Sequence, residues 1–514
     1  MDLINQWLTR GAVEYPTRLA LQGHWVHSDE IASLCYRDLA HKVESCVQQL
    51  QESGVKRVLF RADNSLNWAL ADLSAMKAGL VFIPVPTFFN ESQVAHLIDA
   101  SSADAFWGDW PEWDELQSYG LVAGLPLWVD EVDCPNPLID DTQKITFTSG
   151  STGQPKGVCL SRQVLGNMAQ FLAKGLYESR VILGHHLSVL PLTTLLENIC
   201  ALYVPLALGA CSIICRSEFV GLSGSSRFDA NRFAMALRKF SPHSLVVTPA
   251  LLSVLVHFAR QMPDVCQSLR FVALGGAKVA PDLLHQVSQM GIPVYQGYGL
   301  SECASVVSLN LPRSNRVGSV GKPLANRQLK IDAQGHLHVK GSLMLGYLGQ
   351  AGMSDQWLDT GDLARIDEDG FLYIQGRSSH LIITSFGRNI SPEWVESEAQ
   401  KWPILSDMVV FGDGQKSVCA LVILRGVSEE TSSITRSLEK AIAELNQTLP
   451  DYARIGCLFW SMSGSSLLHD LRTGNGRWRR QQVAQYLNDQ VLQLNADLVH
   501  PVIFSLEHAT DLQA

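Results

Sequence analysis

The chain has 514 residues, of which 46% are hydrophobic and 18% charged, a composition that excludes a disordered protein and predicts at least two domains. Its formal net charge of −10 argues against a general nucleic-acid binder, which needs a basic face. The eleven cysteines include no C-x-x-C pair, and we see no secretory signal and no apolar run of about 18 residues. We therefore expect a cytoplasmic protein with reduced thiols and no transmembrane segment.

Strand and helix patterns alternate along most of the chain. Apolar strand patterns occur at residues 55–60, 80–85, 186–191, 211–215, 244–247, 271–274 and 294–295. Helical spacing of apolar residues occurs at 36–51, 64–79, 91–100, 161–175, 195–208, 229–239, 249–261 and 281–290. This alternation predicts an α/β fold built on a layered, mostly parallel sheet.

The pattern changes from Gly318 onward. Residues 328–339 and then 363–374 alternate in polarity around a turn, which predicts antiparallel hairpins. Shorter elements follow. We therefore predict a large layered N-terminal α/β domain over residues 1–376 and a small C-terminal α+β domain over residues 377–514.

The stretch from Thr146 to Gly157 is rich in glycine and hydroxyl side chains and follows a short apolar entry at Lys144–Ile145. Glycines let a backbone turn tightly and expose its N–H groups, so such a loop suits a polyphosphate. The candidate phosphate-binding residues are Thr148, Ser149, Gly150, Ser151, Thr152, Gly153 and Lys156. The spacing is not that of a Walker A loop, and a solvated Ser/Gly linker is the alternative.

Four further stretches follow this loop, at residues 274–277, 295–302, 358–362 with 376–377, and 471–477. In this order the five closely resemble the adenylate-forming superfamily, which includes acyl-CoA synthetases, carrier-protein-loading domains and luciferases. The resemblance covers nearly the whole chain and is strongest to fatty and aryl acyl-CoA synthetases. It implies that a carboxylic acid is joined to AMP, with loss of pyrophosphate, before a thiol displaces the AMP.

The resemblance also implies roles for single residues. Glu302 would bind Mg²⁺, with hydroxyl help from Ser301 at a position that is usually Thr. Asp362 would accept hydrogen bonds from both ribose hydroxyls, and Arg377 would help to hold the nucleotide. The adenine site would be formed by Tyr298, which would stack on the base, between Gly297 and Gly299, and by Gly275, Gly276 and Ala277, which would let the base approach the backbone. The alternatives are solvated acids, a core aromatic and an exposed linker charge.

The small domain of relatives is mobile and rotates between the two half-reactions. Its hinge corresponds to Ser379, where an acid or Lys is more usual. Rotation would bring Gly387 beside the entering thiol arm of coenzyme A, or of a carrier-protein phosphopantetheine. An ordinary glycine turn is the alternative at Gly387.

The C-terminal stretch departs from the family pattern P-x-T-x-x-G-K, because its proline is Leu471 and its lysine is Arg477. Arg is cationic but planar and bulkier, so the change is not conservative. Three interpretations stay open: Arg477 is the catalytic cation, a neighbouring Arg479 or Arg480 replaces it, or adenylation is weak or lost.

Residues 190–198 occupy the place where many relatives line the acyl pocket. Thr194 stands where a His is common, and Glu197 resembles the glutamate of long-chain acyl-CoA synthetases. No Asp is present to meet a substrate ammonium, which favours an uncharged fatty or aryl tail. The alternative is that Thr194 and Glu197 only pack a helix end.

The sequence thus predicts an ATP- and Mg²⁺-dependent acid–thiol ligase that activates a hydrophobic carboxylic acid as acyl-AMP and transfers it to coenzyme A. The alternatives are a ligase that loads a carrier-protein phosphopantetheine and a non-catalytic binder of nucleotide or acyl-AMP, which Arg477 would explain.

Overall fold

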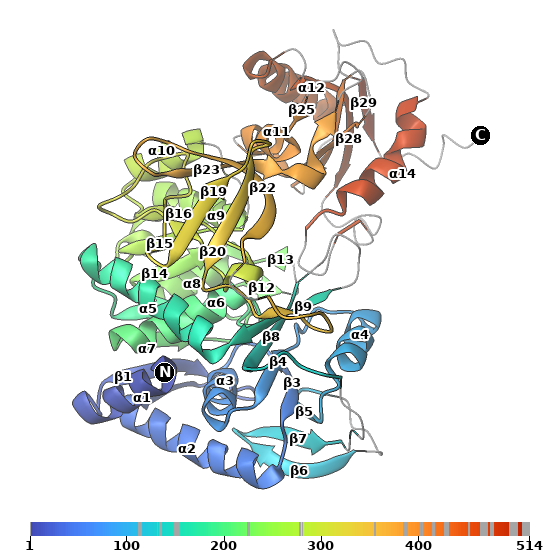
Figure 1. Cartoon of the computed structure of the whole chain (residues 1–514). Helices are drawn as coiled ribbons and strands as arrows, with labels where there is room; N and C mark the ends of the chain where they lie inside the picture. The colour runs from blue at the N-terminus through green and yellow to red at the C-terminus, as the bar shows by residue number, and fades with distance from the viewer. Residues whose placement is uncertain are drawn as a thin grey trace.

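The chain forms a large lobe, which carries the N-terminus, and a smaller lobe that packs on one end of it (Figure 1). The computed structural model describes residues 2–110, 116–130, 132, 136–148, 155–223, 227–276, 279, 281–353, 356–383, 389–400, 402, 404–413, 417–425, 431–450, 453–462, 471–472, 477–492 and 502–505. Among the helices of these segments, none combines the length and the apolar character needed to cross a bilayer.

An eight-stranded sheet of order β21-β9-β8-β4-β3-β5-β7-β6 forms one half of the large lobe. Its strands are β3 (Arg57–Arg61), β4 (Val81–Pro84), β5 (Ala105–Gly108), β6 (Gln117–Val122), β7 (Leu125–Val129), β8 (Thr142–Thr148), β9 (Lys156–Ser161) and β21 (Gly346–Tyr347). The central strands β8, β4, β3 and β5 run parallel, and the outer pairs are antiparallel. The prediction of a layered, largely parallel sheet is confirmed here.

A nine-stranded sheet of order β18-β17-β16-β15-β14-β10-β11-β1-β2 forms the other half. Its strands are β1 (Leu19–His24), β2 (Ile31–Cys35), β10 (His185–Leu187), β11 (Cys211–Ile214), β14 (Ser244–Val247), β15 (Phe271–Leu274), β16 (Val294–Tyr298), β17 (Ser308–Leu309) and β18 (Lys322–Pro323). The strands from β16 to β1 are parallel, as the sequence predicts, and the hairpin of β1 and β2 was not predicted.

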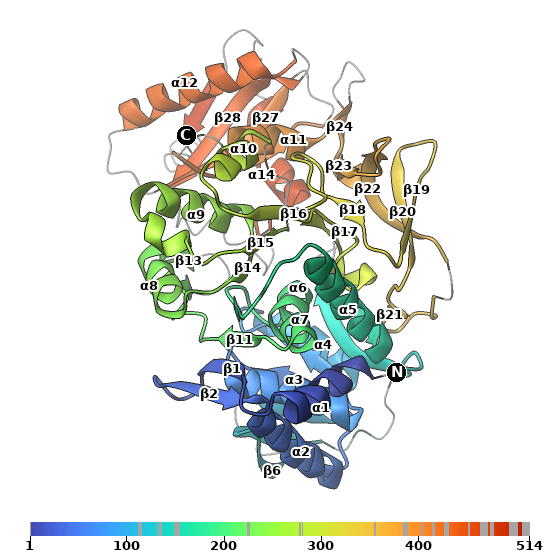
Figure 2. The ribbon, with the colours of Figure 1, turned by 90° about the vertical axis from the view of Figure 1, so that its left-hand side faces the viewer.

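Helices cover and separate the two sheets, as the two views show (Figures 1 and 2). They are α1 (Leu3–Glu14), α2 (Tyr36–Ser53), α3 (Leu66–Ala78), α4 (Glu91–Ser101), α5 (Arg162–Glu178), α6 (Leu195–Asn198), α7 (Val204–Leu208), α8 (Ala230–Phe240), α9 (Pro249–Gln261) and α10 (Pro281–Gln289), with short helical turns at Pro263–Cys266 and Ser301–Cys303. Local capping fixes several ends: Ser65 accepts the Trp68 N–H at the start of α3, and Gly79 ends it at a φ of 82°.

One predicted helix and one predicted strand differ from the structure. The helix expected over residues 195–208 is interrupted by a π-helical segment, η1 (Ile199–Tyr203), between α6 and α7. The strand expected over 186–191 ends at Leu187, because side chains take the backbone groups that follow it. Glu197 accepts the Val189 N–H, and Asn64 bonds to the Leu190 carbonyl and the Leu192 N–H.

The part of the chain after Gly318 forms an antiparallel sheet and then the small lobe. The sheet has the order β19-β20-β22-β23, with β19 (Arg327–Ile331), β20 (His336–Gly341), β22 (Leu358–Ile366) and β23 (Leu372–Arg377). Both predicted hairpins are therefore confirmed. Short pairs are formed by β12 (Leu222–Ser223) with β13 (Arg227–Phe228), and by β24 (Ile382–Ile383) with β25 (Asn389–Ile390).

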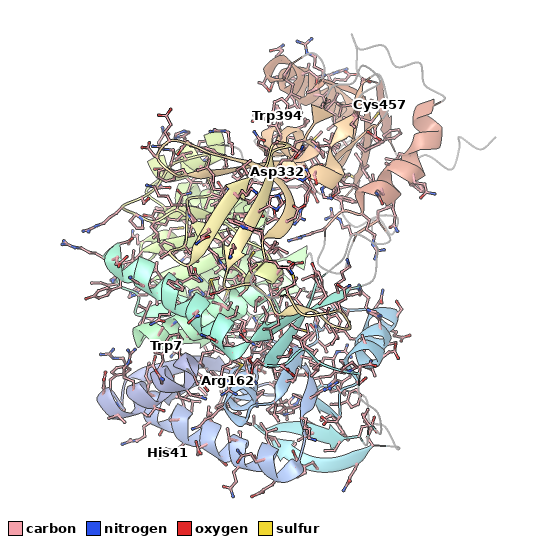
Figure 3. All side chains as sticks on the ribbon, in the orientation of Figure 1. Trp7, His41, Arg162, Asp332, Trp394 and Cys457 are labelled. Atoms are coloured by element: carbon pink, nitrogen blue, oxygen red, sulfur yellow. The ribbon has the colours of Figure 1, made fainter. Side chains whose placement is uncertain are left out.

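The small lobe packs helices against a four-stranded sheet, with Trp394 on α11 and Cys457 on β28 (Figure 3). Its elements are η4 (Ser378–His380), α11 (Pro392–Ala399), β26 (Leu405–Phe411), β27 (Val418–Leu424), α12 (Thr431–Thr448), β28 (Ile455–Met462), α14 (Arg480–Leu492) and β29 (Val502–Ser505). The strands β26 and β27 are antiparallel, and β27, β28 and β29 are parallel, which confirms an α+β domain. The domain boundary near residue 376 stays a prediction.

Helix α8 shows how strongly burial separates neighbouring positions. Phe233 is fully buried among the apolar side chains under the nine-stranded sheet, whereas Met235, two residues on, is 67% exposed. We expect Phe233→Ala to lower the stability of the large lobe by about 3–5 kcal/mol, because it leaves a cavity in a close-packed core. Met235→Ala, the control in the same helix, is expected to change stability by about 0.5 kcal/mol or less. Urea unfolding followed by tryptophan fluorescence measures both, and equal midpoints would contradict the assigned packing.

Candidate active site

The predicted phosphate loop is the connection of a β-hairpin. Its two ends are paired, since Thr148 at the end of β8 lies opposite Lys156 at the start of β9. The Thr148 Oγ1 also donates to the Lys156 carbonyl over 3.5 Å. Ser149, Gly150, Ser151, Thr152 and Gly153 lie outside the described residues. The hairpin therefore fixes where the loop begins and ends.

Lys156 lies beside a residue that the sequence analysis missed. Its Nζ is 5.5 Å from the ring centre of Tyr347, on the short strand β21 that pairs with β9. The Tyr347 hydroxyl donates to Glu302 Oε1 over 2.9 Å. Burial and the Glu302 charge raise the pKa of Tyr347, so the hydroxyl stays protonated and donating. No motif surrounds Tyr347, and contacts with segments far from it in sequence bring it here: β21 pairs with β9, and the Met344 N–H donates to the Glu302 carbonyl.

Glu302 is suited to a magnesium ion that is also held by phosphates. It lies in the turn Ser301–Cys303, and both Ser301 and Glu302 are half-buried. Across the described parts of the chain, no group of three or more His, Cys, Asp or Glu side chains is arranged to hold a metal ion. Mg²⁺ is usually bound by one or two carboxylates together with substrate phosphates and waters, which a single Glu beside a phosphate loop provides.

The predicted ribose and adenine residues are joined directly. Asp362, on β22, is 4% exposed and accepts a hydrogen bond from the Tyr298 hydroxyl, while its Oδ1 lies 2.8 Å from the Arg377 Nε. Arg377 also donates to the Thr360 carbonyl over 3.0 Å. Burial raises the pKa of Asp362, and the Arg377 charge and the Tyr298 hydrogen bond oppose this increase. A carboxylate that accepts one hydrogen bond and forms one ion pair is thereby held at one position.

The glycines beside Tyr298 are required by close backbone contacts. A methyl group on Gly299 would lie 1.6 Å from the Ser305 carbonyl oxygen, and one on Gly297 would lie 3.0 Å from Leu309 Cδ1. Gly275 is open by comparison, with Leu196 Cδ2 3.7 Å from such a methyl, and Gly276 has a φ of 93°. Ala277 lies outside the described residues. The close contacts of Gly297 and Gly299 therefore constrain the backbone conformation at Tyr298, with or without a ligand.

Arg477 comes from the small lobe, at the end of a loop that is closed at its base. Arg472 and Trp478 form an isolated bridge across the loop, and the Arg472 guanidinium lies 3.7 Å from the Trp478 ring centre. Both side chains donate to the Asp407 Oδ2, over 2.6 Å and 2.9 Å. Leu471, at the position of the family proline, is 7% exposed and packs in the core of the small lobe.

The guanidinium of Arg477 interacts with the charges of the large lobe. Desolvation and the Arg377 charge lower the pKa of Arg477, and the Asp362 and Glu302 charges raise it. The residue as a whole keeps exposed surface, so its head group is crowded by protein while the side chain stays accessible from solvent. The charge of the last predicted stretch therefore acts on the same carboxylates, Asp362 and Glu302, that the other stretches supply.

The two neighbouring arginines have other partners. Arg480 forms a bidentate pair with Glu396, with an Nη2–Oε2 distance of 2.5 Å, and donates to the Val410 carbonyl. The Arg479 Nε donates to the Arg472 carbonyl over 3.1 Å. The structure therefore favours Arg477 over these two as the cation of the site.

The joint between the lobes is close-packed around β23 and α11. The Ser391 hydroxyl donates to the Gln375 carbonyl over 2.8 Å, and a methyl group on Gly376 would lie 2.3 Å from the same hydroxyl oxygen. The predicted hinge residue Ser379 is exposed in η4. Gly387, the predicted thiol-arm residue, lies outside the described residues.

The two predicted pocket residues have different environments. Thr194 is exposed at the start of α6. Glu197 is 0% exposed, and its Oε1 accepts the Val189 N–H over 2.8 Å. Burial raises the pKa of Glu197 to about 8. The alternative that Glu197 packs a helix end accounts for the hydrogen bond it makes, and of the two residues only Thr194 keeps exposed surface.

Comparisons with known proteins agree with this arrangement. A sequence profile of the AMP-binding enzyme family matches residues 8–348, and one of the AMP-binding enzyme C-terminal domain matches residues 379–498. A 2-succinylbenzoate–CoA ligase of Bacillus subtilis is 27% identical over 418 residues, which are 77% of this chain and 77% of that protein. A long-chain-fatty-acid–CoA ligase of Mycobacterium bovis is 35% identical over 161 residues, which are 30% of this chain and 27% of that ligase.

A solved structure shows the same fold. It is that of O-succinylbenzoate coenzyme A synthetase from Bacillus subtilis in complex with ATP and magnesium ion. The TM-score is 0.71 at 23% identity, over 93% of this chain and 98% of that chain.

The buried carboxyl of Glu197 makes stability depend on pH. Because its pKa is raised to about 8, from about 4.3 in an unfolded chain, its contribution to stability is full below about pH 4 and is lost as the pH rises through about 8. Glu197→Gln keeps an acceptor for the Val189 N–H but does not titrate. We expect the melting temperature of the variant minus that of the unmodified protein to increase by about 3 °C or more from pH 5.5 to pH 8.5. Glu178→Gln, at an exposed position, is the control, and a difference that stays constant with pH would contradict the assignment.

Proposed function

We propose a specific activity for this chain, which belongs to the AMP-binding enzyme family. It activates a hydrophobic carboxylic acid as acyl-AMP and then transfers the acyl group to coenzyme A. The predicted membership in the adenylate-forming superfamily, as an acid–thiol ligase of the acyl-CoA synthetase type, is confirmed at the level of the family. The predicted architecture of a large α/β domain and a small C-terminal domain is confirmed as well.

The observation that carries the proposal is the direct pairing of Asp362 with Tyr298 and Arg377. The charge of Arg477, from the small lobe, interacts with the charges of Arg377, Asp362 and Glu302. Asp362 is held by Tyr298, and Glu302 by Tyr347, which lies beside Lys156 at the phosphate loop. Residues from four of the five predicted stretches are thus linked to one another by contacts or by charge. A linker, a core aromatic or a turn acid would not require this convergence, which therefore supports a single nucleotide site.

The roles of the residues follow from the charge that must be offset. Asp362 would accept the ribose hydroxyls, and Tyr298 would lie against the base. Lys156 would face the β- and γ-phosphates, and Glu302 would hold Mg²⁺, which supplies positive charge to the phosphates when bound. Arg477 would lie between the acid carboxylate and the α-phosphate, where its fixed charge stabilises the negative charge that develops as pyrophosphate leaves.

The class of acid is inferred from the pocket and the relatives. Over residues 186–200, all of them described, Glu197 is the one carboxylate, and it is buried against the Val189 N–H. No carboxylate of this segment is therefore available to bind the ammonium group of an amino acid. Relatives named as 2-succinylbenzoate and long-chain-fatty-acid ligases support an aryl or fatty acid, and their CoA names support coenzyme A over a carrier protein as the acceptor.

Substitution of Arg477 tests the adenylation step. We expect Arg477→Met to lower acid-dependent ATP–pyrophosphate exchange about 10²-fold or more, because a preorganised charge on the developing anion is lost. Arg477→Lys keeps a cation in the same closed loop and is expected to retain at least about a tenth of the exchange, a loss of at most ~1.4 kcal/mol. The panel of acids is dodecanoate, benzoate, 2-succinylbenzoate, acetate and leucine.

The control is Arg436→Met, which removes an exposed arginine of the same lobe and is expected to leave exchange unchanged. If the unmodified protein binds AMP but shows no exchange with any acid, the non-catalytic binder replaces the proposed enzyme. Incubation of the active acid with ATP and either coenzyme A or a holo-carrier protein, followed by mass spectrometry, identifies the acceptor thiol.

A further inference from the structure

A buried polar network lies in the middle of the large lobe, outside the residues assigned so far. We call it the Lys144 network, and its members are Asp72 on α3, Lys144 on β8, Asn198 at the end of α6 and Tyr203 at the end of η1. Each of the four is 1% exposed or less. The sequence analysis interpreted Lys144–Ile145 as an apolar strand entry and did not identify the network.

Every proton of the lysine head group has a partner. The Lys144 Nζ donates to Asp72 Oδ1, to Asn198 Oδ1 over 2.7 Å and to the Tyr203 hydroxyl over 2.8 Å. The Asp72 Oδ2 in turn accepts from the Tyr203 hydroxyl over 2.5 Å and from the Asn198 amide over 3.3 Å. Because an ammonium group only donates, this arrangement also fixes which way the Asn198 amide faces.

The network is costly to bury, so a purely packed core would be the simpler solution. Desolvation lowers the pKa of Lys144, while its ion pair with Asp72 raises it. Buried ion pairs are often replaced by apolar residues without loss of stability, because desolvation offsets much of their attraction. The rings of Phe82 and Tyr203 flank the ammonium at 5.4 Å and 5.2 Å. The closed set of hydrogen bonds thus specifies positions more than it adds stability.

The network specifies the positions of two segments of the proposed site, the phosphate loop and the turn at Thr194 that would meet the acid. We call these segments the two half-sites. Lys144 lies four residues before Thr148, where β8 ends and the phosphate loop begins. Asn198 lies four residues after Thr194, in the turn of α6 that also carries Leu196 toward Gly275. One hydrogen bond between Lys144 and Asn198 therefore links the strand of the phosphate loop, in one sheet, to the helix that follows β10 of the other.

The π-helical segment keeps Tyr203 within reach of this bond. In η1 the Val204 N–H bonds to the Ile199 carbonyl, five residues back, so the helix widens at that point. Single π-turns inside α-helices frequently occur at functional sites, because they re-aim the side chains that follow. The Tyr203 hydroxyl can then bond to both Lys144 and Asp72 while Asn198, five residues earlier, does the same.

We propose that the Lys144 network is a positioning device, which holds the strand of the phosphate loop in register with the acid-binding turn. The proposal rests on the proposed function, since it assumes that phosphates bind at one end and the acid at the other. A displacement of about 1 Å between reacting groups can cost about 10²-fold in rate. A network that fixes this register would therefore act on the joining of acid and nucleotide more than on the binding of either.

Two variants test the proposal. Asp72→Asn combined with Lys144→Met removes both charges together and keeps the shapes, so no buried charge is left unpaired. Tyr203→Phe removes only one hydroxyl and is the milder variant, which decides the question if the double variant does not fold. Tyr36→Phe is the matched control, because it removes an equally buried hydroxyl of the same lobe, which donates to the Ala210 carbonyl rather than to a member of the Lys144 network.

The probes are AMP and 5′-O-(dodecanoylsulfamoyl)adenosine, with the benzoyl analogue in parallel, and the readout is the dissociation constant by calorimetry. The sulfamoyl analogues occupy both half-sites at once and need no catalysis. We expect AMP affinity to change less than twofold in every variant. The better analogue is expected to bind about tenfold more weakly to the double variant and about threefold more weakly to Tyr203→Phe, with Tyr36→Phe unchanged.

The outcomes separate this proposal from the one on which it rests. Folded variants that bind the analogue as tightly as the unmodified protein does would reduce the network to a structural role and overturn the proposal. Equal weakening of AMP and analogue would also overturn it, because the network would then support nucleotide binding alone. If the unmodified protein binds AMP but no analogue more tightly than AMP, the acid half-site is absent. If it binds no AMP, the proposed function itself fails.

Discussion

The fixed point of the structure is the buried carboxylate of Asp362. It accepts the Tyr298 hydroxyl on one oxygen and pairs with Arg377 on the other, so it joins the nine-stranded sheet to the antiparallel sheet that leads into the small lobe. Its charge is held in a site where burial raises its pKa and Arg377 opposes that increase. A second cation, Arg477, then enters from the other lobe. Charges of the large lobe thus act on a cation of the small lobe across the joint.

Without a ligand, the positive and negative charges of the four side chains at this junction nearly cancel. Arg377 and Arg477 repel one another, and Asp362 and Glu302 attract both. A polyphosphate adds negative charge at the side where Lys156 lies, which favours the arrangement with both arginines present. If the proposed nucleotide site is correct, nucleotide binding and the position of the small lobe would be coupled through these same charges.

Much of the fold could be predicted from the sequence, because local patterns and tertiary packing agree over most of it. The helix at 249–261 and the strands at 244–247 and 271–274 have the bounds that apolar spacing predicts. The predicted strand at 186–191 ends early in the structure. The side chains of Asn64 and Glu197 form hydrogen bonds with the backbone groups that would continue it. The prediction of a continuous helix over 195–208 was wrong because a π-helical segment interrupts it, and the Tyr203 hydroxyl at the end of that segment bonds to Lys144, which comes from another sheet.

The candidate site divides in the same way. Glu302, Asp362, Arg377 and Arg477 lie in short stretches whose residue types reveal their chemistry, and the structure brings them together. Tyr347 and the closure of the 472–478 loop on Asp407 could not be predicted, because each depends on contacts between segments far apart in sequence. The sequence shows Lys144 as a charged residue in an apolar strand. Its role could not be predicted, because its partner Asp72 lies 72 residues away.

The absence of a side chain at Gly376 has a consequence for how the two lobes meet. The Ser391 hydroxyl occupies the space that any side chain at Gly376 would need. A methyl group there would clash with Ser391 and raise the free energy of this arrangement of the lobes. It would not affect an arrangement in which Gly376 and Ser391 are apart. The absence of a side chain at Gly376 is therefore a condition for the contact between β23 and Ser391 in this arrangement, and a single added carbon atom would disfavour it.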